Sequence, residues 1–351
     1  MQRITVHSYV DGCSSYGFLG EQVTQALSEQ GWFPSINPIQ LNEDADVMPL
    51  THQSIVRRCH PSEPNIICHT PDIQNWCEDP IHFTMWEASR LKQNQVENLN
   101  KAKAVIVPSK WNSETFSAAG VESPIHVVPL GINTRIFNYR PRHRRSVLTF
   151  GAAGKLHGIW NSDGTFKSYD NRKNFDAIEL AFAEAFPTGN EPVELKVKVF
   201  PNQINREPED SRISLIQKHL SQREVLNFYN SIDCFVSASR GEGWGWMQQE
   251  SMACGRPVIA PIFGGLREFM TPENSFSVDY GYSKPDMFYE GCGLWAEPDI
   301  EHIAHHMRSI YENPSLLDQK APLASASAMA YDWTRFSLRL DEVVSGVIND
   351  G

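Results

Sequence analysis

The sequence predicts an α/β protein of two domains, each built on a parallel β-sheet. Short apolar runs alternate with stretches of helical periodicity along most of the 351 residues, which is the pattern of strands connected by helices. A polar and basic stretch at 131–145, which contains Pro141, interrupts the alternation. A chain of this length is long enough for two domains, each with its own core.

The apolar runs place the elements of both halves. In the first half, strands are expected at 4–10, 65–70, 83–86, 104–108 and 126–130, with helices at 17–30, 91–100 and 111–119. In the second half, strands are expected at 146–151, 195–200, 234–239 and 258–261. These elements predict an N-terminal domain at 1–138, a linker at 139–146, a second domain at 147–330 and a C-terminal helix at 331–351.

Three helices of the second half have sequence signals of their own. One should begin near Asn171, an N-cap residue type, because the positions that follow form one apolar face: Phe175, Ile178, Phe182 and Phe186. A second should follow Ser221, since Glu224 three residues later completes a capping box. The third is the amphipathic stretch at 332–347.

Charge and cysteine content narrow the function classes. The formal charge of −11 argues against a broad nucleic-acid surface. The segment 139–173 is an exception, with eight Lys and Arg against two Asp; it is either a solvated linker or a phosphate-binding rim. Seven scattered cysteines, no apolar stretch of 18 residues and no signal-peptide pattern at the start predict a cytoplasmic protein without a membrane span.

The strongest functional signal is the segment 239–260, SRGEGWGWMQQESMACGRPVIA. It predicts a buried strand, a turn rich in glycine (Gly241, Gly243, Gly245), and a helix from about residue 246 to 253 that Gly255 and Pro257 end. Such a unit presents backbone N–H groups and the positive end of a helix dipole to an anion. Glycines let the backbone approach a diphosphate closely.

Two carboxylates flank this turn. Glu242 lies in the turn, and Glu250 lies eight residues later in the helix, roughly 6–7 Å along the axis from the helix start at ~1.5 Å per residue. That separation matches the spacing of a pyrophosphate and the ribose of one nucleotide. A carboxylate accepts two hydroxyl donors, so Glu250 suits a ribose diol.

This segment resembles the Glu-x7-Glu region of the retaining family 4 (group 1) glycosyltransferases, which have the GT-B fold. The resemblance implies two facing Rossmann-like domains with a deep cleft and a C-terminal helix, opened by Trp333, that crosses back to the first domain. It assigns donor-sugar hydroxyls to Glu242 and the nucleotide ribose to Glu250. It also implies donor contacts from the residues between them: Gly243, Trp244, Gly245 and Trp246.

One departure from the family concerns the cations on the donor phosphates. The family usually has an Arg two residues after the Phe of the second domain's first strand, where this chain has Ala152. We expect Arg172 and Lys173 to replace it, or Lys173 alone, because departure of a nucleoside diphosphate develops negative charge that nearby cations stabilise.

Three features of the first domain complete the expected site. Gly17, in the stretch Gly17-Phe-Leu-Gly20, resembles the family's loop facing donor and acceptor. His69 follows a strand, at the sheet edge where α/β ligands bind; the resemblance implies a bond to the donor sugar, with a structural role as the alternative. Glu87, in Thr84-Met-Trp-Glu87, is a candidate acceptor-binding or hinge residue.

The resemblance implies a reaction without a protein nucleophile, a metal or another cofactor, with a nucleotide-sugar such as a UDP- or GDP-sugar as co-substrate. Asp44-Ala-Asp46 has the Asp-x-Asp pattern that would suit a manganese-dependent GT-A enzyme. It lies in a polar loop, and we interpret the match as chance. The expected product is a hexose-type sugar on an acceptor hydroxyl, most simply of a carbohydrate. Glycosylation of a modified nucleic-acid base and a non-catalytic nucleotide-sugar-binding protein stay open. A dehydrogenase is disfavoured because no Gly-x-Gly-x-x-Gly follows a strand.

Overall fold

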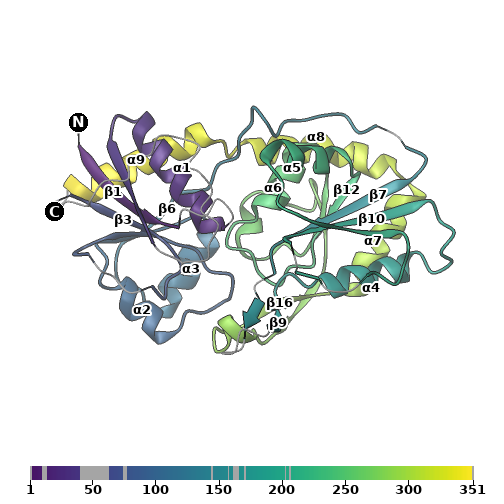
Figure 1. The fold of residues 1–351 in the computed structure, drawn as a ribbon, viewed down its shortest axis with the longest axis horizontal. Coiled ribbons are helices and arrows are strands. Elements are labelled where there is room, and N and C mark those ends of the chain that lie inside the picture. Colours follow the sequence, from purple (N-terminus) through teal and green to yellow (C-terminus); the bar gives the residue numbers. More distant parts are fainter. Residues whose placement is uncertain are drawn as a thin grey trace. The chain divides into compact units, whose positions relative to one another are not determined.

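The structure, a computed structural model, forms two compact units (Figure 1). The first contains Met1–Trp86, Arg90–Gly131 and Tyr331–Gly351, and the second contains Glu87–Ser89 and Ile132–Ala330. The expected domain limits given above stay predictions. The residues that the structure describes are 2–9, 14–39, 63–73, 77–143, 145–156, 158–160, 166–169, 171–201, 203–204 and 207–349.

The first unit contains a six-stranded parallel sheet in the order β2-β1-β3-β4-β5-β6. Its strands are β1 (Arg3–Ser8), β2 (Phe33–Pro38), β3 (Asn65–Cys68), β4 (Ile81–Phe83), β5 (Ala104–Val107) and β6 (Ile125–Val127). Its helices are α1 (Ser15–Glu29), α2 (Gln93–Leu99), α3 (Lys110–Ala119) and α9 (Trp333–Asn349). The central strands are buried on both faces, which explains their continuous apolar sequences.

This sheet differs from the expected elements in two places. β2 was not expected, because its sequence contains two prolines and little apolar character. The strand expected at 83–86 is shifted: β4 ends at Phe83, and the chain continues as a loop. The reason is that the Tyr16 hydroxyl accepts from the Met85 amide at 3.2 Å and donates to the Met85 carbonyl at 3.0 Å, so a side chain replaces strand partners there.

The C-terminal helix α9 packs beside α1 within the first unit (Figure 1). The Trp32 indole donates to Asp341 at 2.7 Å, and Ser337 donates to the carbonyl of Ala26 at 3.0 Å. Gly131 is required at the other end, because a Cβ there would lie 2.6 Å from the Trp333 ring. None of the described helices combines the length and apolar character needed to cross a membrane.

The second unit contains another six-stranded parallel sheet, in the order β11-β10-β7-β12-β13-β14. Its strands are β7 (Leu148–Ala153), β10 (Val193–Val199), β11 (Ile213–Gln217), β12 (Cys234–Val236), β13 (Val258–Ala260) and β14 (Phe276–Ser277). Its α-helices are α4 (Phe175–Ala185), α5 (Gln222–Asn230), α6 (Trp246–Ala253), α7 (Ile300–Glu312) and α8 (Ser315–Met329), and its short helices are η1 (Gly264–Glu268) and η2 (Met287–Tyr289).

Two small antiparallel hairpins accompany this sheet. One pairs β8 (Gly158–Trp160) with β9 (Phe166–Tyr169), in the stretch between β7 and α4. The other pairs β15 (Tyr280–Ser283) with β16 (Trp295–Pro298). Arg240 holds the second hairpin, because its guanidinium binds both carboxylate oxygens of Glu297 at 2.7 Å.

The helix expected to begin near Asn171 begins four residues later. The N-cap of α4 is Asn174, in a left-handed conformation with φ 49°. Asn171 is unable to take that role because its carbonyl accepts from Arg240 Nη1 at 2.6 Å, which holds 171–173 outside the helix. The expected apolar face of α4 is confirmed, since all four of its phenylalanine and isoleucine positions are buried. The Ser221–Glu224 capping box is confirmed as well.

Candidate functional site

The strand–turn–helix unit predicted from the sequence is present in the second unit. β12 ends at Val236, the glycine-rich turn follows, and α6 extends over the predicted residues 246–253. Gly245 is the N-cap of α6 with φ 102°, a left-handed conformation that favours glycine. The N-terminus of α6 is the positive end of the helix dipole, so it attracts an anion.

The glycines of the turn allow close backbone packing. A Cβ on Gly245 would lie 2.3 Å from Leu266 Cδ2, and a Cβ on Gly265 would lie 2.2 Å from the Gly243 carbonyl oxygen. The Gly265 amide also donates to the Glu242 carbonyl at 2.7 Å. The loop at the start of η1 therefore packs against the turn and holds the backbone at Glu242.

Glu242 lies in a buried cluster with the two predicted cations. Lys173 Nζ is 2.5 Å from Glu242 Oε1, and Arg172 Nη1 is 3.5 Å from Glu242 Oε2. Arg172 Nη1 also donates to the Gly241 carbonyl at 2.8 Å. All three charged side chains are less than a tenth exposed. Gln248, which sequence reasoning missed, donates to Glu242 Oε1 at 3.4 Å and to Ser237 at 3.0 Å.

Charge and burial shift the pKa values of this cluster in opposite directions. Burial raises the pKa of Glu242, but the adjacent Lys173 and Arg172 outweigh it and hold that pKa below its usual value. Burial lowers the pKa of Lys173, and the attraction of Glu242 opposes this shift only in part. Each partner thus stabilises the charged form of the other, and an anion entering the cluster would meet two positive groups.

Arg240 positions the cations against the turn. Its backbone amide donates to the Arg172 carbonyl at 2.8 Å, and its guanidinium binds Glu297 and the Asn171 carbonyl. Arg172 and Lys173 are consequently held just before α4 rather than at its first turn. No local sequence pattern indicates this arrangement, since Glu297 is 57 residues from Arg240.

Glu250 lies on α6 beside a tyrosine that sequence reasoning also missed. The Tyr229 hydroxyl donates to Glu250 Oε2 at 2.9 Å. Burial raises the pKa of Glu250 to about 7, although Tyr229 and Lys198 act in the opposite direction. Glu250 as a whole residue is partly exposed, so a ligand can reach part of it.

The two tryptophans of the turn are placed differently. Trp244 is 1% exposed, donates from its indole to Gln249 at 2.7 Å and packs against Phe269. Any donor contact by Trp244 would therefore involve its backbone. Trp246, the first residue of α6, is partly exposed. Gly243 is buried.

Gly17 and His69 belong to the first unit. Gly17 lies in the first turn of α1, where its amide donates to the N-cap Ser14 at 2.9 Å. His69 bonds the Tyr9 hydroxyl through Nε2 and Thr70 through Nδ1 at 2.8 Å, and burial lowers its pKa. The structure brings Glu242, Arg172 and Lys173 together in the second unit, with Glu250 on the helix that follows. That His69 and Gly17 share a site with them stays a prediction.

Arg142 and Arg145 of the basic segment are engaged within the protein. Arg142 forms ion pairs with Asp233 at 3.2 Å and Asp318 at 3.4 Å. Arg145 donates to the carbonyls of Ser231 at 2.6 Å and Asn230 at 2.9 Å. These contacts favour a structural role for much of the segment.

The described residues contain no group of three or more His, Cys, Asp or Glu side chains that could hold a metal ion. Asp44 and Asp46 lie outside the described residues.

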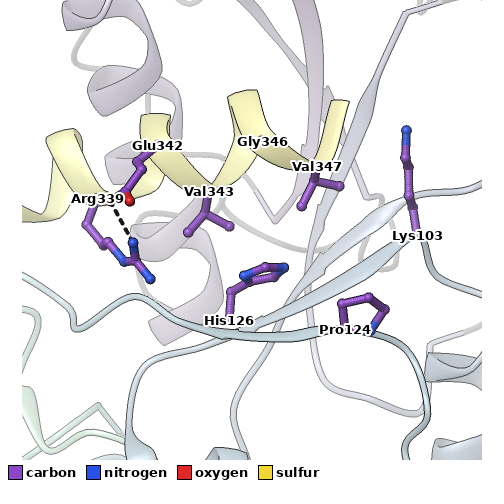
Figure 2. A pocket seen from close by; sticks show the side chains of 8 residues that line it. All are labelled: Lys103, Pro124, His126, Arg339, Glu342, Val343, Gly346 and Val347. Atoms are coloured by element: carbon purple, nitrogen blue, oxygen red, sulfur yellow. Dashed lines mark hydrogen bonds and ion pairs between the residues drawn. The ribbon is translucent and has the colours of Figure 1, made fainter. Parts of the chain in front are cut away.

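A surface pocket of about 410 Å³ lies in the first unit between β6 and α9 (Figure 2). Val343 and Val347 project into it, and Lys103 and His126 line the opposite side. Arg339 at its rim is already paired with Glu342 at 2.6 Å. The pocket contains none of the predicted site residues and is distinct from the Glu242 cluster.

Sequence comparison identifies the part of the chain that contains α6 and both glutamates. The family model described as glycosyl transferases group 1 matches residues 184–313, which include α6 and both glutamates. The resemblance to group 1 glycosyltransferases is confirmed. The D-inositol 3-phosphate glycosyltransferase of Streptosporangium roseum is 30% identical over 127 residues. That alignment covers 36% of this chain and 26% of that relative's length.

Solved structures resemble the whole chain in fold. Sucrose-phosphate synthase from Thermosynechococcus elongatus matches with a TM-score of 0.72 at 14% identity, covering 100% of both chains. The Anabaena protein Alr3699/HepE, solved in complex with UDP-glucose, matches with a TM-score of 0.67 at 13% identity over 99% of this chain and 100% of that one. Together with the two parallel sheets, these matches confirm the expected α/β fold class of the GT-B type.

Proposed function

We propose that the protein is a retaining glycosyltransferase that moves a hexose-type sugar from a nucleotide-sugar donor to an acceptor hydroxyl. The observation that carries this proposal is the buried cluster of Glu242, Lys173 and Arg172 at the turn before α6, with Glu250 further along the same helix. Two cations and a helix N-terminus suit a diphosphate, and a carboxylate on a partly exposed residue suits a ribose. The group 1 match over the same helix supports it.

The residues take the following roles in this proposal. Arg172, Lys173 and the first turn of α6 bind the diphosphate, Glu250 accepts from the ribose hydroxyls, and Glu242 accepts from the donor sugar. Glu242 is suited to this because the neighbouring cations keep it ionised. A UDP-sugar is the first donor to test, since the similarly folded Anabaena protein was solved with UDP-glucose.

The chemistry follows from these positions without a metal or a protein nucleophile. The bond between the anomeric carbon and the phosphate oxygen breaks, and the negative charge that develops on the diphosphate is stabilised by Arg172 and Lys173. The acceptor hydroxyl forms the new bond on the same face and gives its proton to the departing phosphate oxygen. Retention of configuration is the consequence.

We propose a carbohydrate or another polyhydroxylated small molecule as the acceptor. The relative from Streptosporangium roseum, whose name specifies an inositol phosphate, is consistent with this class. The internal ion pairs and carbonyl bonds of Arg142 and Arg145 argue against a nucleic-acid surface along the basic segment.

The first experiment is a thermal-shift titration with UDP, GDP, ADP and their common sugar conjugates. A ligand at 100 times its dissociation constant stabilises the folded state by about 2.7 kcal/mol. The wild type should respond to one nucleotide family, and Glu250→Ala should lose most of that response. Glu194→Ala, which removes an exposed carboxylate on β10, is the matched control. Absence of any response in the wild type at millimolar nucleotide would contradict the proposal.

Stereochemistry and metal dependence are tested separately once a donor is known. NMR of the anomeric proton of the product should report the configuration of the donor, and an inverted product would exclude the retaining reaction. Transfer should continue in excess EDTA. Loss of transfer that Mn²⁺ or Mg²⁺ restores would instead show a metal requirement.

A further inference from the structure

The acidic residue Glu87 is part of the second unit and packs against the glycine-rich turn. Its carbonyl oxygen lies where a side chain on Gly241 would be, 1.9 Å from the Cβ position. Its carboxylate accepts from the Tyr289 hydroxyl at 2.9 Å. The backbone and the side chain of Glu87 are therefore fixed by different parts of the unit.

The residues after Glu87 are held by the loop between β15 and β16. The Ser89 amide donates to the Leu294 carbonyl at 3.0 Å, and the Leu294 amide donates to Ser89 Oγ at 2.8 Å. Tyr289 belongs to the same loop and is 5% exposed. Three hydrogen bonds thus hold residues 87–89 against this loop, and they define the position of the Glu87 carboxylate.

Glu87 also acts on the cations of the cluster. The Arg172 guanidinium lies 5.9 Å from the centre of the Tyr289 ring, and Glu87 attracts both Arg172 and Lys173. We infer that Glu87 is a third carboxylate of the proposed donor site: with Tyr289 it positions Arg172 and sets the net charge that a nucleoside diphosphate meets. This inference rests on the proposed function and assigns Glu87 and Tyr289 as positioning residues.

Ionisation of Glu87 should weaken the binding of a diphosphate. Four groups face the Glu87 carboxyl: Arg172, Lys173, Glu242 and Tyr289. Burial raises the pKa of Glu87, and Arg172 and Tyr289 oppose the rise only in part. When Glu87 is protonated, two cations face one carboxylate; when it is ionised, they face two. A diphosphate therefore binds the protonated form better, and its affinity falls as pH rises through the pKa of Glu87.

The test is calorimetric titration with UDP and GDP between pH 4.5 and 9, on the wild type and on Glu87→Gln. Glutamine keeps an acceptor for Tyr289 but has no charge. We expect the ratio of the Glu87→Gln affinity to the wild-type affinity to be smallest at the lowest pH and to rise to about tenfold at the highest pH. Tyr289→Phe removes one hydrogen bond to the ionised form, and when it takes the place of the wild type the rise of this ratio should move to higher pH.

Glu290→Gln is the matched control, because Glu290 is exposed on the same loop; its pH profile should match the wild type. A constant affinity ratio between Glu87→Gln and the wild type across the pH range, or an unmoved profile in Tyr289→Phe, would overturn the inference. If the wild type binds neither nucleotide at any pH, the proposed function itself is wrong. This outcome differs from both results that would overturn the inference, so the two failures are distinguishable.

Discussion

Lys173 Nζ lies 2.5 Å from Glu242 Oε1, and both side chains are less than a tenth exposed. A buried ion pair is weak evidence for net stability, because desolvation opposes the attraction. Here the pair lies beside the N-terminus of α6 and a second cation, Arg172. Glu242 is thus an internal counter-ion for positive charge that the proposed function assigns to a diphosphate.

This arrangement predicts unequal losses of stability when either partner is neutralised. Glu242→Gln leaves two buried cations without a carboxylate and should lower the free energy of unfolding by about 3 kcal/mol or more. Lys173→Met should cost less, because Glu242 keeps Arg172 at 3.5 Å. The double variant should lose less than the sum of both. Urea unfolding measures all three.

An exposed pair provides the control. Lys218 lies 3.2 Å from Glu224 with both side chains well exposed, and Lys218→Met should leave the free energy of unfolding nearly unchanged. If Lys173→Met were the more destabilising of the two single variants, Arg172 would not be a significant partner of Glu242.

The sequence predicted the glycine turn and α6 well because their signals are local. A strand end, three glycines, and a Gly and a Pro after the helix lie within one short segment, and the predicted helix bounds match α6. The expected N-cap at Asn171 failed for the opposite reason. Its carbonyl is held by Arg240, 69 residues away, and no local pattern encodes such a contact.

The partners of the site carboxylates were unpredictable for the same reason. Tyr229 is 21 residues from Glu250, and Tyr289 is 202 residues from Glu87. Nothing in the sequence around either tyrosine distinguishes it from a core aromatic residue. The sequence could identify charged residues as site candidates, but the hydrogen bonds that tune them arise only from the tertiary fold.

Donor affinity should depend on the ionisation of Glu250. With a pKa of about 7, the fraction of Glu250 in the carboxylate form increases about tenfold between pH 6 and 8. Since an ionised carboxylate accepts from both ribose hydroxyls, UDP affinity should rise with pH by up to that factor. The rise should be measured in Glu87→Gln, where the opposing effect of Glu87 is absent.

Two variants isolate this effect. Glu250→Gln in the same background should bind more weakly and with no pH dependence in this range. Tyr229→Phe removes a bond that lowers the pKa of Glu250, so the rise should move to higher pH. A pH dependence that survived Glu250→Gln would assign it to another group.

Arg142 should contribute to stability and not to nucleotide binding. Its side chain is 6% exposed and pairs with Asp233, which is 2% exposed and also accepts from the Thr149 amide at 2.9 Å. Arg142→Ala leaves that carboxylate buried without its cation and should cost about 3 kcal/mol. UDP affinity should stay within a factor of two, about 0.4 kcal/mol.

Arg135→Ala, at an exposed position just before the basic segment, should change neither quantity. A tenfold or greater loss of UDP affinity in folded Arg142→Ala would place the basic segment at the phosphates, contrary to its internal ion pairs.

Gly241 should tolerate no side chain, because of the residue packed against it. A Cβ there would lie 1.9 Å from the Glu87 carbonyl oxygen, a backbone atom that cannot rotate away. Gly241→Ala should therefore displace 87–89 or the turn, and lower the free energy of unfolding by about 1–3 kcal/mol. It should also weaken UDP binding, since Arg172 donates to the Gly241 carbonyl. Gly281→Ala is the matched control, because no atom lies within 4 Å of its Cβ position. Equal unfolding midpoints for the two variants would show that 87–89 is not packed on the turn in solution, and would remove the basis for a role of Glu87 at the cations.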